Sequence, residues 1–199
     1  VDNNIALRST VTIENPYDKE RRANIQLRQL ELSKEGVSLL QSFIGADKLN
    51  IEEKVGNCTI NGEAEITSEK LNGSLRVQTG NGSIATKIAY NTKGEFDITA
   101  NGEEININNL IAINEPLMCS LQTKASGNLS KKNKNIKLTG SITDLESSKY
   151  AFAPIDISGE YNMAANKFTA NIRTFDPALT AQMNMNYTNE SEHRVVLSL

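Results

Sequence analysis

The sequence predicts an all-β fold, an elongated antiparallel meander with one short helix in its N-terminal third. Apolar and polar residues alternate with period two along most of the chain, which is typical of strands with one apolar and one solvated face. Turn signals rich in Asn and Gly separate these runs about every ten residues. Only residues 33–46 depart from the alternation, because their apolar residues have helical spacing.

Length and composition favour an extended protein over a compact one. The 199 residues suggest one elongated domain or two small ones, at roughly 150 residues per domain. Only 38% of them are hydrophobic and 5% aromatic, which is little for one compact globule. The net charge of -3 argues against a nucleic-acid partner, because such surfaces are usually basic. The chain has no apolar run long enough to cross a bilayer, and it starts at Val1 without Met. We therefore interpret it as an internal piece whose anchor or signal lies elsewhere.

We divide the chain into residues 1–50, with strands and the short helix, and residues 51–199, with repeated β-hairpins. In the first part, residues 5–13 and 24–32 alternate and are expected to pair across the turn at Pro16–Asp18. The helix is expected from Ser33, a plausible N-cap, to Ala46. Its apolar side carries Val37, Leu40, Phe43 and Ile44, and it is expected to cap one end of the sheet.

In the second part, the Asn-Gly dipeptides predict tight hairpin turns. Asn81-Gly82 and Asn101-Gly102 have the composition of type I′ turns, Asn72-Gly73 repeats the dipeptide, and residues 91–94 form a related signal. Residues 131–135 and 162–167 are longer polar connectors. The strands between these connectors place a set of apolar residues on one face. These residues are Ile98, Ile107, Leu121, Leu129, Leu138, Ile142, Ile155, Ile157, Tyr161, Met163, Phe168, Ile172, Leu179, Met183 and Met185.

The residues offer little to a catalytic or metal site. His193 is the only imidazole, and no G-x-S-x-G or Walker A sequence occurs. Glu103 and Glu104 are adjacent, so in a regular strand they point to opposite faces and do not converge. Cys58 and Cys119 could form one disulfide or remain two buried thiols, and the sequence leaves both alternatives open. We expect a protein that is not an enzyme, with no catalytic residues, metal or cofactor.

Between Gly140 and Leu179 the strands follow a recurring pattern. Its parts are Gly140-x-Ile142-x-x-Leu145, Tyr150-x-Phe152, Ile155-x-Ile157-x-Gly159-x-Tyr161, Phe168-x-Ala170-x-Ile172 and Asp176-Pro177-x-Leu179. This pattern resembles the repeat of Bacteroidota members of the TamB family, the inner-membrane component of the translocation and assembly module, within the AsmA-like group of bridge-forming lipid-transfer proteins. Residues 117–127 also resemble the strand that precedes this repeat. The family's N-terminal membrane helix and C-terminal translocation domain have no counterpart in the chain, and residues 1–50 have no place in the family pattern.

The resemblance implies an open, taco-like β-groove with an apolar interior. It also implies a periplasmic location, with the full-length protein tethered to the inner membrane. In such a groove the apolar set given above would bind the acyl chains of phospholipids moving towards the outer membrane. Soft, adaptable side chains such as Met163, Met183 and Met185 suit a promiscuous surface of this kind.

Other readings of the same alternation remain open. The apolar residues could instead fill a closed β-sandwich, as in an adhesin-like surface protein. The chain could also be a scaffold that assists the assembly of outer-membrane β-barrel proteins by strand addition. The sequence leaves the lipid species, the direction of transport and the oligomeric state undetermined.

Overall fold

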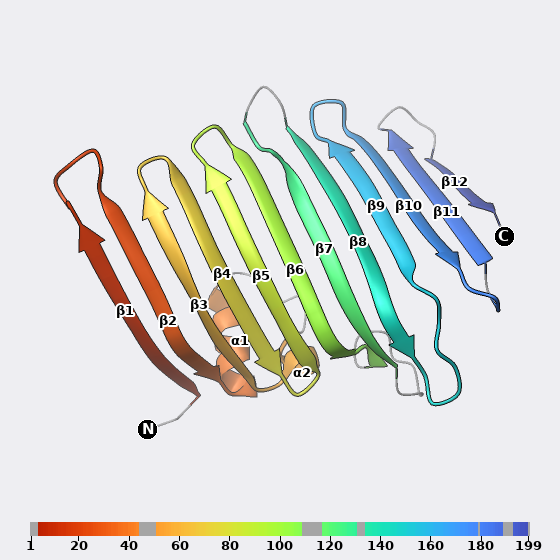
Figure 1. The fold of residues 1–199 in the computed structure, drawn as a ribbon, viewed down its shortest axis with the longest axis horizontal. Coiled ribbons are helices and arrows are strands. Elements are labelled where there is room, and N and C mark those ends of the chain that lie inside the picture. Colours follow the sequence, from red (N-terminus) through yellow and green to blue (C-terminus); the bar gives the residue numbers. More distant parts are fainter. Residues whose placement is uncertain are drawn as a thin grey trace.

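The computed structural model describes residues 4–43, 51–108, 117–130, 134–178, 180–188 and 193–198. These residues contain twelve strands and two short helices (Figure 1). The first elements are β1 (Ile5–Glu14), β2 (Arg22–Leu32), α1 (Lys34–Phe43), α2 (Ile51–Val55), β3 (Cys58–Thr67) and β4 (Lys70–Thr79). The remaining strands are β5 (Gly82–Asn91), β6 (Glu95–Asn106), β7 (Met118–Asn128), β8 (Asn135–Glu146), β9 (Ile155–Asn162), β10 (Lys167–Phe175), β11 (Thr180–Thr188) and β12 (His193–Ser198).

The strands form one open antiparallel sheet in which spatial order follows sequence order from β1 to β12. Each strand pairs only with its neighbours in sequence, so β1 and β12 are the two edges and do not meet. Short polar turns connect strands that are neighbours in the sheet. One of them is Gly80-Asn81 between β4 and β5, which is followed by Gly82 with a positive φ of 119°. The predicted all-β meander is confirmed, and no second sheet lies among the described residues.

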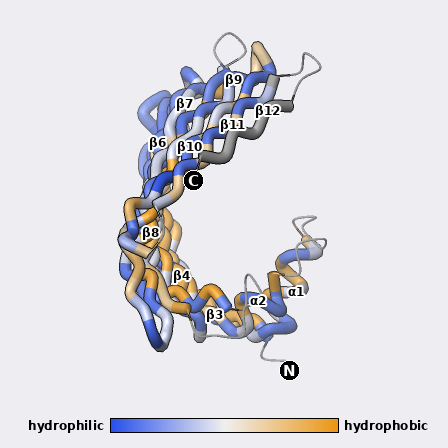
Figure 2. The backbone as a smooth tube through the Cα atoms, turned by 90° about the vertical axis from the view of Figure 1, so that its right-hand side faces the viewer, coloured by the Kyte–Doolittle hydropathy of each residue, from blue (hydrophilic) through white to orange (hydrophobic). Residues whose placement is uncertain are grey.

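The sheet is bent so that one of its faces is concave. Viewed along the direction in which the strands succeed one another, the backbone has a C-shaped profile that opens towards the helices (Figure 2). Register irregularities mark bulges in β2 between Leu27 and Leu30, in β6 between Gly102 and Ile105, and in β8 near Asp144. All three lie towards the C-terminal ends of their strands, which share one rim of the sheet. Because a bulge kinks its strand and increases the local twist, these three contribute to the bend.

The two helices lie on the concave side, at one end of β2–β4 (Figures 1 and 2). Ser33 is the N-cap of α1, as predicted, because its Oγ accepts a hydrogen bond from the Gly36 amide at 3.1 Å. Gly36 in turn permits close approach to the backbone of Asn4, whose oxygen would lie 2.1 Å from a Cβ at this position. Val37 is buried with Leu32 and Cys58 in the main hydrophobic cluster of the described residues.

Three details differ from the sequence prediction. Asn101-Gly102 is not a turn but lies inside β6, and Asn72-Gly73 likewise lies inside β4. The five-residue helix α2 was not predicted, because a single turn leaves too short a periodic pattern. Helix α1 is described as far as Phe43, so the expected end at Ala46 lies outside the described residues. Leu40 and Phe43, predicted to be part of its packing side, are exposed.

Candidate functional site: an uncovered apolar face

Strand pairing aligns the apolar residues into rows that cross the sheet at right angles to the strands. One row consists of Leu27, Gly62, Leu75, Thr86, Ala100, Thr123, Gly140, Ile157, Ile172 and Met183. The row beside it consists of Val11, Ile25, Ala64, Gly73, Ile88, Ile98, Ala125, Leu138, Gly159, Ala170 and Met185. These two central rows mix small residues with large aliphatic ones.

Two outer rows flank the central pair. The row towards the helices consists of Leu7, Leu30, Ile60, Val77, Ile84, Gly102, Leu121, Ile142, Ile155, Thr174 and Ala181. The row at the opposite rim consists of Ile13, Ala23, Ile66, Leu71, Tyr90, Phe96, Gly127, Ile136, Tyr161, Phe168 and Tyr187. We call the four rows together the apolar face, and none of its residues is charged.

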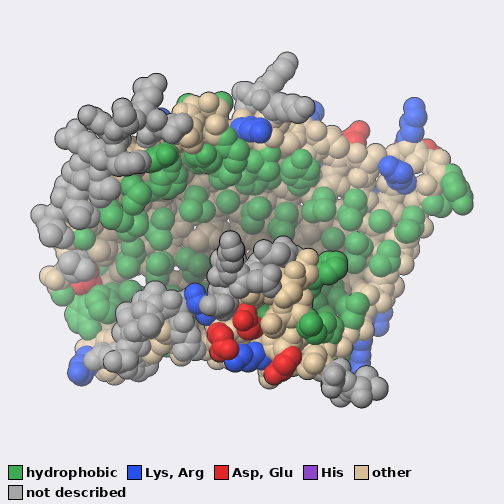
Figure 3. Space-filling model, turned by 180° about the vertical axis from the view of Figure 1, so that it is seen from behind, with side chains coloured by type: hydrophobic (Ala, Val, Ile, Leu, Met, Phe, Trp, Pro, Cys, Tyr) green, Lys and Arg blue, Asp and Glu red, His purple; other side chains and the backbone are tan. Residues whose placement is uncertain are grey.

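Most of the apolar face is not covered by other residues that the structure describes. The space-filling view from the helix side shows hydrophobic side chains across the middle of the apolar face and charged side chains at the borders of this face (Figure 3). Leu75, Ile84, Leu138 and Tyr90 are 40–44% exposed, and most other large members are half-buried. Outside β2–β4, strand neighbours account for most of this burial, because no second layer of described residues packs on that part of the sheet. An exposed apolar surface of this extent is unusual for a soluble monomer and marks an interaction site.

The structure places eleven of the predicted site residues on strands of this face. They are Ile98, Leu121, Leu138, Ile142, Ile155, Ile157, Tyr161, Phe168, Ile172, Met183 and Met185. Ile107, Leu129 and Met163 follow the ends of β6, β7 and β9, where their amides donate to backbone oxygens of Leu117, Gly94 and Lys134. Leu179 lies outside the described residues.

The prediction of this face missed its N-terminal part. Leu7, Val11, Ile25, Ile60 and Val77 belong to the same rows as the predicted residues. Their period-two alternation was visible in the sequence and could have placed them there. The face therefore begins at β1 and spans all the strands, and at β2–β4 it is partly covered by α1 and α2.

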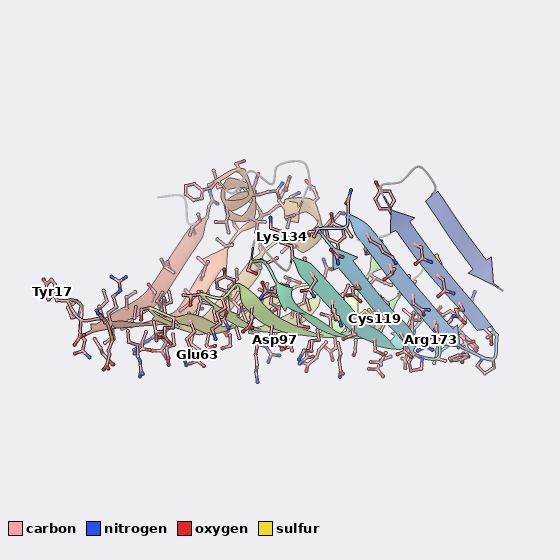
Figure 4. The ribbon with its side chains drawn as sticks, turned by 90° about the horizontal axis from the view of Figure 1, so that it is seen from above. Tyr17, Glu63, Asp97, Cys119, Lys134 and Arg173 are labelled. Carbon is pink, nitrogen blue, oxygen red and sulfur yellow. The ribbon has the colours of Figure 1, made fainter. Side chains whose placement is uncertain are left out.

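Charged side chains project from the other face of the sheet. Figure 4 shows Glu63, Asp97 and Arg173 on the side away from the helices. A hollow of about 830 Å³ lies on this polar face across β1–β6, lined by Thr10, Gln26, Glu63, Ser74 and Lys87 among others. Asp97 at its border pairs with Lys124 at 2.7 Å, but both side chains are about half exposed, so the ion pair contributes little to stability. The charged side chains of Glu63, Lys87 and Asp97 make this hollow less suited to hydrocarbon than the charge-free apolar face.

A buried carboxylate joins two loops at one end of β8–β11. Asp176 is 2% exposed, and its Oδ1 accepts hydrogen bonds from the Tyr150 hydroxyl at 2.6 Å and the Ala178 amide at 2.7 Å. Its Oδ2 accepts a third from the Ala153 amide at 2.6 Å. The bond to Asp176 raises the pKa of Tyr150 above its ordinary value. Tyr150 also stacks edge-on against Phe152, with ring centroids 4.8 Å apart. The hydrogen bond between Tyr150 and Asp176 joins two parts of the recurring sequence pattern.

The distance between Cys58 and Cys119 shows whether they can form a disulfide. Cys58 begins β3 and Cys119 lies on β7, four strands away, which is about 19 Å at the usual strand spacing. A disulfide needs Cα atoms within about 7 Å of each other, so both residues are free thiols. Burial raises the pKa of both thiols and makes them poor nucleophiles.

The described residues hold little else of chemical interest. No group of three or more His, Cys, Asp or Glu residues in this part of the chain could hold a metal ion. Glu103 and Glu104 lie in the β6 bulge, where Glu104 has a positive φ of 52°. His193 is the first residue of β12. None of the helices that the structure describes is long and apolar enough to span a membrane. The chain matches no protein-family model, no curated protein and no solved structure.

Proposed function

We propose that this chain is a non-enzymatic segment of a periplasmic bridge-like protein of the TamB type, and that its apolar face carries phospholipid acyl chains towards the outer membrane. The observation that carries the proposal is the uncovered, charge-free apolar face that crosses the whole sheet. The resemblance of residues 140–179 to the TamB repeat is the reason why the proposal names this family and this compartment. The acyl chains would lie along the rows, and the charged headgroups would remain in water at the open side.

The physical basis is the cost of hydrocarbon in water. Each CH₂ group contributes about 0.8 kcal/mol, so an acyl chain that leaves a bilayer costs on the order of 10 kcal/mol. A surface that follows the chain with continuous apolar contact lowers that barrier along the route. The same contact would bury the half-exposed side chains of the apolar face, which the fold itself leaves in water.

The test is lipid binding by the purified protein and by a charged variant of the face. Ile157 lies in a central row between Gly140 and Ile172. Ile157→Asp should leave the fold intact, because the new carboxylate can stay hydrated on an open face, but it should reduce copurifying phospholipid several-fold. Ser158→Asp, on the polar face of the same strand, is the matched control and should retain lipid. Phospholipid is quantified by extraction and mass spectrometry, and unfolding by circular dichroism.

Two results would contradict the proposal. The first is an unmodified protein that neither copurifies with phospholipid nor takes it up from vesicles. The second is an Ile157→Asp variant that unfolds while Ser158→Asp remains folded, because this would mean that the face is a closed core in solution.

A second candidate function rests on the edge strand β1. All ten of its residues are exposed, so its free backbone groups could pair with an incoming strand of an outer-membrane β-barrel precursor. A photo-crosslinker at Thr10 tests this candidate. It should capture unfolded barrel protein, and a crosslinker at Asp156 in the middle of the sheet should not.

A further inference from the structure

We propose that the helical insert formed by α1 (Lys34–Phe43) and α2 (Ile51–Val55) is a lid that acyl chains displace from the β2–β4 end of the apolar face. This inference rests on the proposed lipid-carrying function, and it adds that the insert controls access to one end of the apolar face. The insert interrupts the meander between β2 and β3 and lies on the concave side of the sheet (Figure 2).

The lid covers the same surface that is open elsewhere. Val37 of α1 forms a buried cluster with Leu32 and Cys58, and Ile51 and Val55 of α2 pack against this cluster together with the sheet residues Leu30, Ile60 and Val77. Leu30, Ile60 and Val77 begin the outer row that continues as Ile84, Leu121 and Ile142 without a lid. An acyl chain that follows this row towards β2 therefore meets the insert and competes with it for the same apolar contacts.

Helix α1 does not use its most apolar side for docking. Gly36, Val37 and Gln41 are its buried residues, and Gln41 is a polar side chain that is only 5% exposed. Leu39, Leu40 and Phe43 remain 58%, 40% and 88% exposed. An amphipathic helix ordinarily buries its apolar stripe. The docked position thus leaves an apolar surface in water that contact with acyl chains would cover.

The two covalent connections between the insert and the sheet lie side by side. Its two ends leave from Leu32 and Cys58, which are partners in the β2–β3 ladder. The Lys34 amide donates to Asn57 Oδ1 at 2.9 Å, which links the two ends directly. Gly56 has a positive φ of 63°, and no atom within 4 Å would oppose a Cβ there. Two adjacent attachment points allow the helices to swing as a unit about the end of the sheet.

In the docked state, one buried polar atom of the insert lacks a hydrogen bond. Glu52 Oε2 is excluded from solvent and has no hydrogen-bond partner within the described residues. A carboxylate oxygen in this position has lost its hydration, and this loss favours undocking. Opposing it is the hydrogen bond from Asn81 Nδ2, in the β4–β5 turn, to the Lys54 carbonyl oxygen at 2.7 Å. The ion pair between Lys34 Nζ and Glu53 Oε1 at 2.7 Å connects the two helices to each other and is kept when they move together.

The two native cysteines allow the lid to be observed in the unmodified protein. Cys58 is buried beneath the insert, whereas Cys119 is equally buried on β7 away from it. The experiment measures the rate of N-ethylmaleimide addition to each thiol by peptide mass spectrometry, with and without vesicles of phosphatidylethanolamine and phosphatidylglycerol. Bound lipid is quantified in the same samples. We expect lipid to increase the labelling rate of Cys58 by about fivefold or more, which is the lower end of typical coupling between two sites. The labelling rate of Cys119 should not change.

Each outcome has a distinct meaning. Lipid binding without a change at Cys58 overturns the lid and leaves the lipid-carrying function standing. Equal acceleration at both thiols also overturns the lid, because it indicates general loosening of the sheet. Absence of lipid binding overturns the proposed function and the lid together.

A double variant tests the role of the exposed side of α1. Leu39→Ser with Phe43→Ser removes apolar surface that plays no part in docking. Without lipid, its Cys58 should label at the native rate, and with lipid the acceleration should fall at least about twofold. Tyr17→Ser, at the fully exposed β1–β2 turn, is the control and should respond as the native chain does. A double variant that responds fully to lipid would contradict this role.

Discussion

At the scale of single residues, few polar side chains are buried in the described part of the chain, and each of them connects particular segments of the fold. Asp176 is the clearest case, because one carboxylate receives three donors from two loops. Hydrogen bonds to both oxygens offset much of the cost of burying this carboxylate. The sequence showed the Asp176-Pro177 pair and Tyr150, but their contact depends on the register of β8–β11 and could not be derived from spacing.

The hydrogen bond from Tyr150 to Asp176 predicts a loss of stability at high pH. Because this bond raises the pKa of Tyr150 above its usual value near 10.0, the folded state favours the neutral phenol. The contribution is fully present below the unfolded pKa and is lost as the pH rises through the folded one. Urea unfolding of the native chain and of Tyr150→Phe should therefore show a difference in free energy that is constant from pH 7 to 9 and shrinks above pH 10. A difference that stays constant to pH 11 would contradict the bond.

At the scale of elements, bulges and turns share the same residue types, which limits what a sequence can predict. Asn81-Gly82 does lie at a hairpin turn, where Gly82 begins β5, whereas the identical dipeptide Asn101-Gly102 lies within β6. Gly102 pairs with Ile84 and Leu121 there, directly before the bulge. Local turn chemistry alone does not distinguish these cases, since the difference lies in pairing with β7. Alternation, by contrast, located most strands correctly, because its period follows directly from strand geometry.

The β6 bulge predicts that a glycine at Glu104 stabilises the protein. Glu104 has a φ of 52°, in the left-handed region that non-glycine residues occupy at a cost. Glu104→Gly should raise the free energy of unfolding by roughly 1 kcal/mol, as measured by urea denaturation. Glu103→Gly, one residue earlier in the same bulge but without a positive φ, is the control and should lower it by roughly 0.5–1 kcal/mol. Equal effects of the two substitutions would show that the bulge is not at this position in solution.

At the scale of the whole molecule, a single-layer sheet leaves two surfaces that most folds cover. One is the apolar face, which a second layer would ordinarily bury. The other is the pair of free edges, which a barrel would remove by closure. The sequence predicted the apolar face through its alternation, but it could not show how the face ends. The helical insert at β2–β4 depends on contacts between distant residues such as Val37 and Cys58.

The free edge at β1 predicts concentration-dependent self-association. This strand is ten residues long and contains no Pro, and its apolar Ile5, Leu7, Val11 and Ile13 are 49–62% exposed. It therefore lacks the devices that usually protect an edge, such as a bulge of its own or a charge pointing to the apolar side. Val11→Lys supplies such a charge at its centre and should shift the midpoint of association roughly tenfold to higher concentration, as measured by sedimentation velocity. Tyr17→Lys adds the same charge at the adjacent turn, outside the ladder, and should leave the midpoint unchanged. If the two variants shift it equally, association follows net charge, and the β1 edge is not the contact.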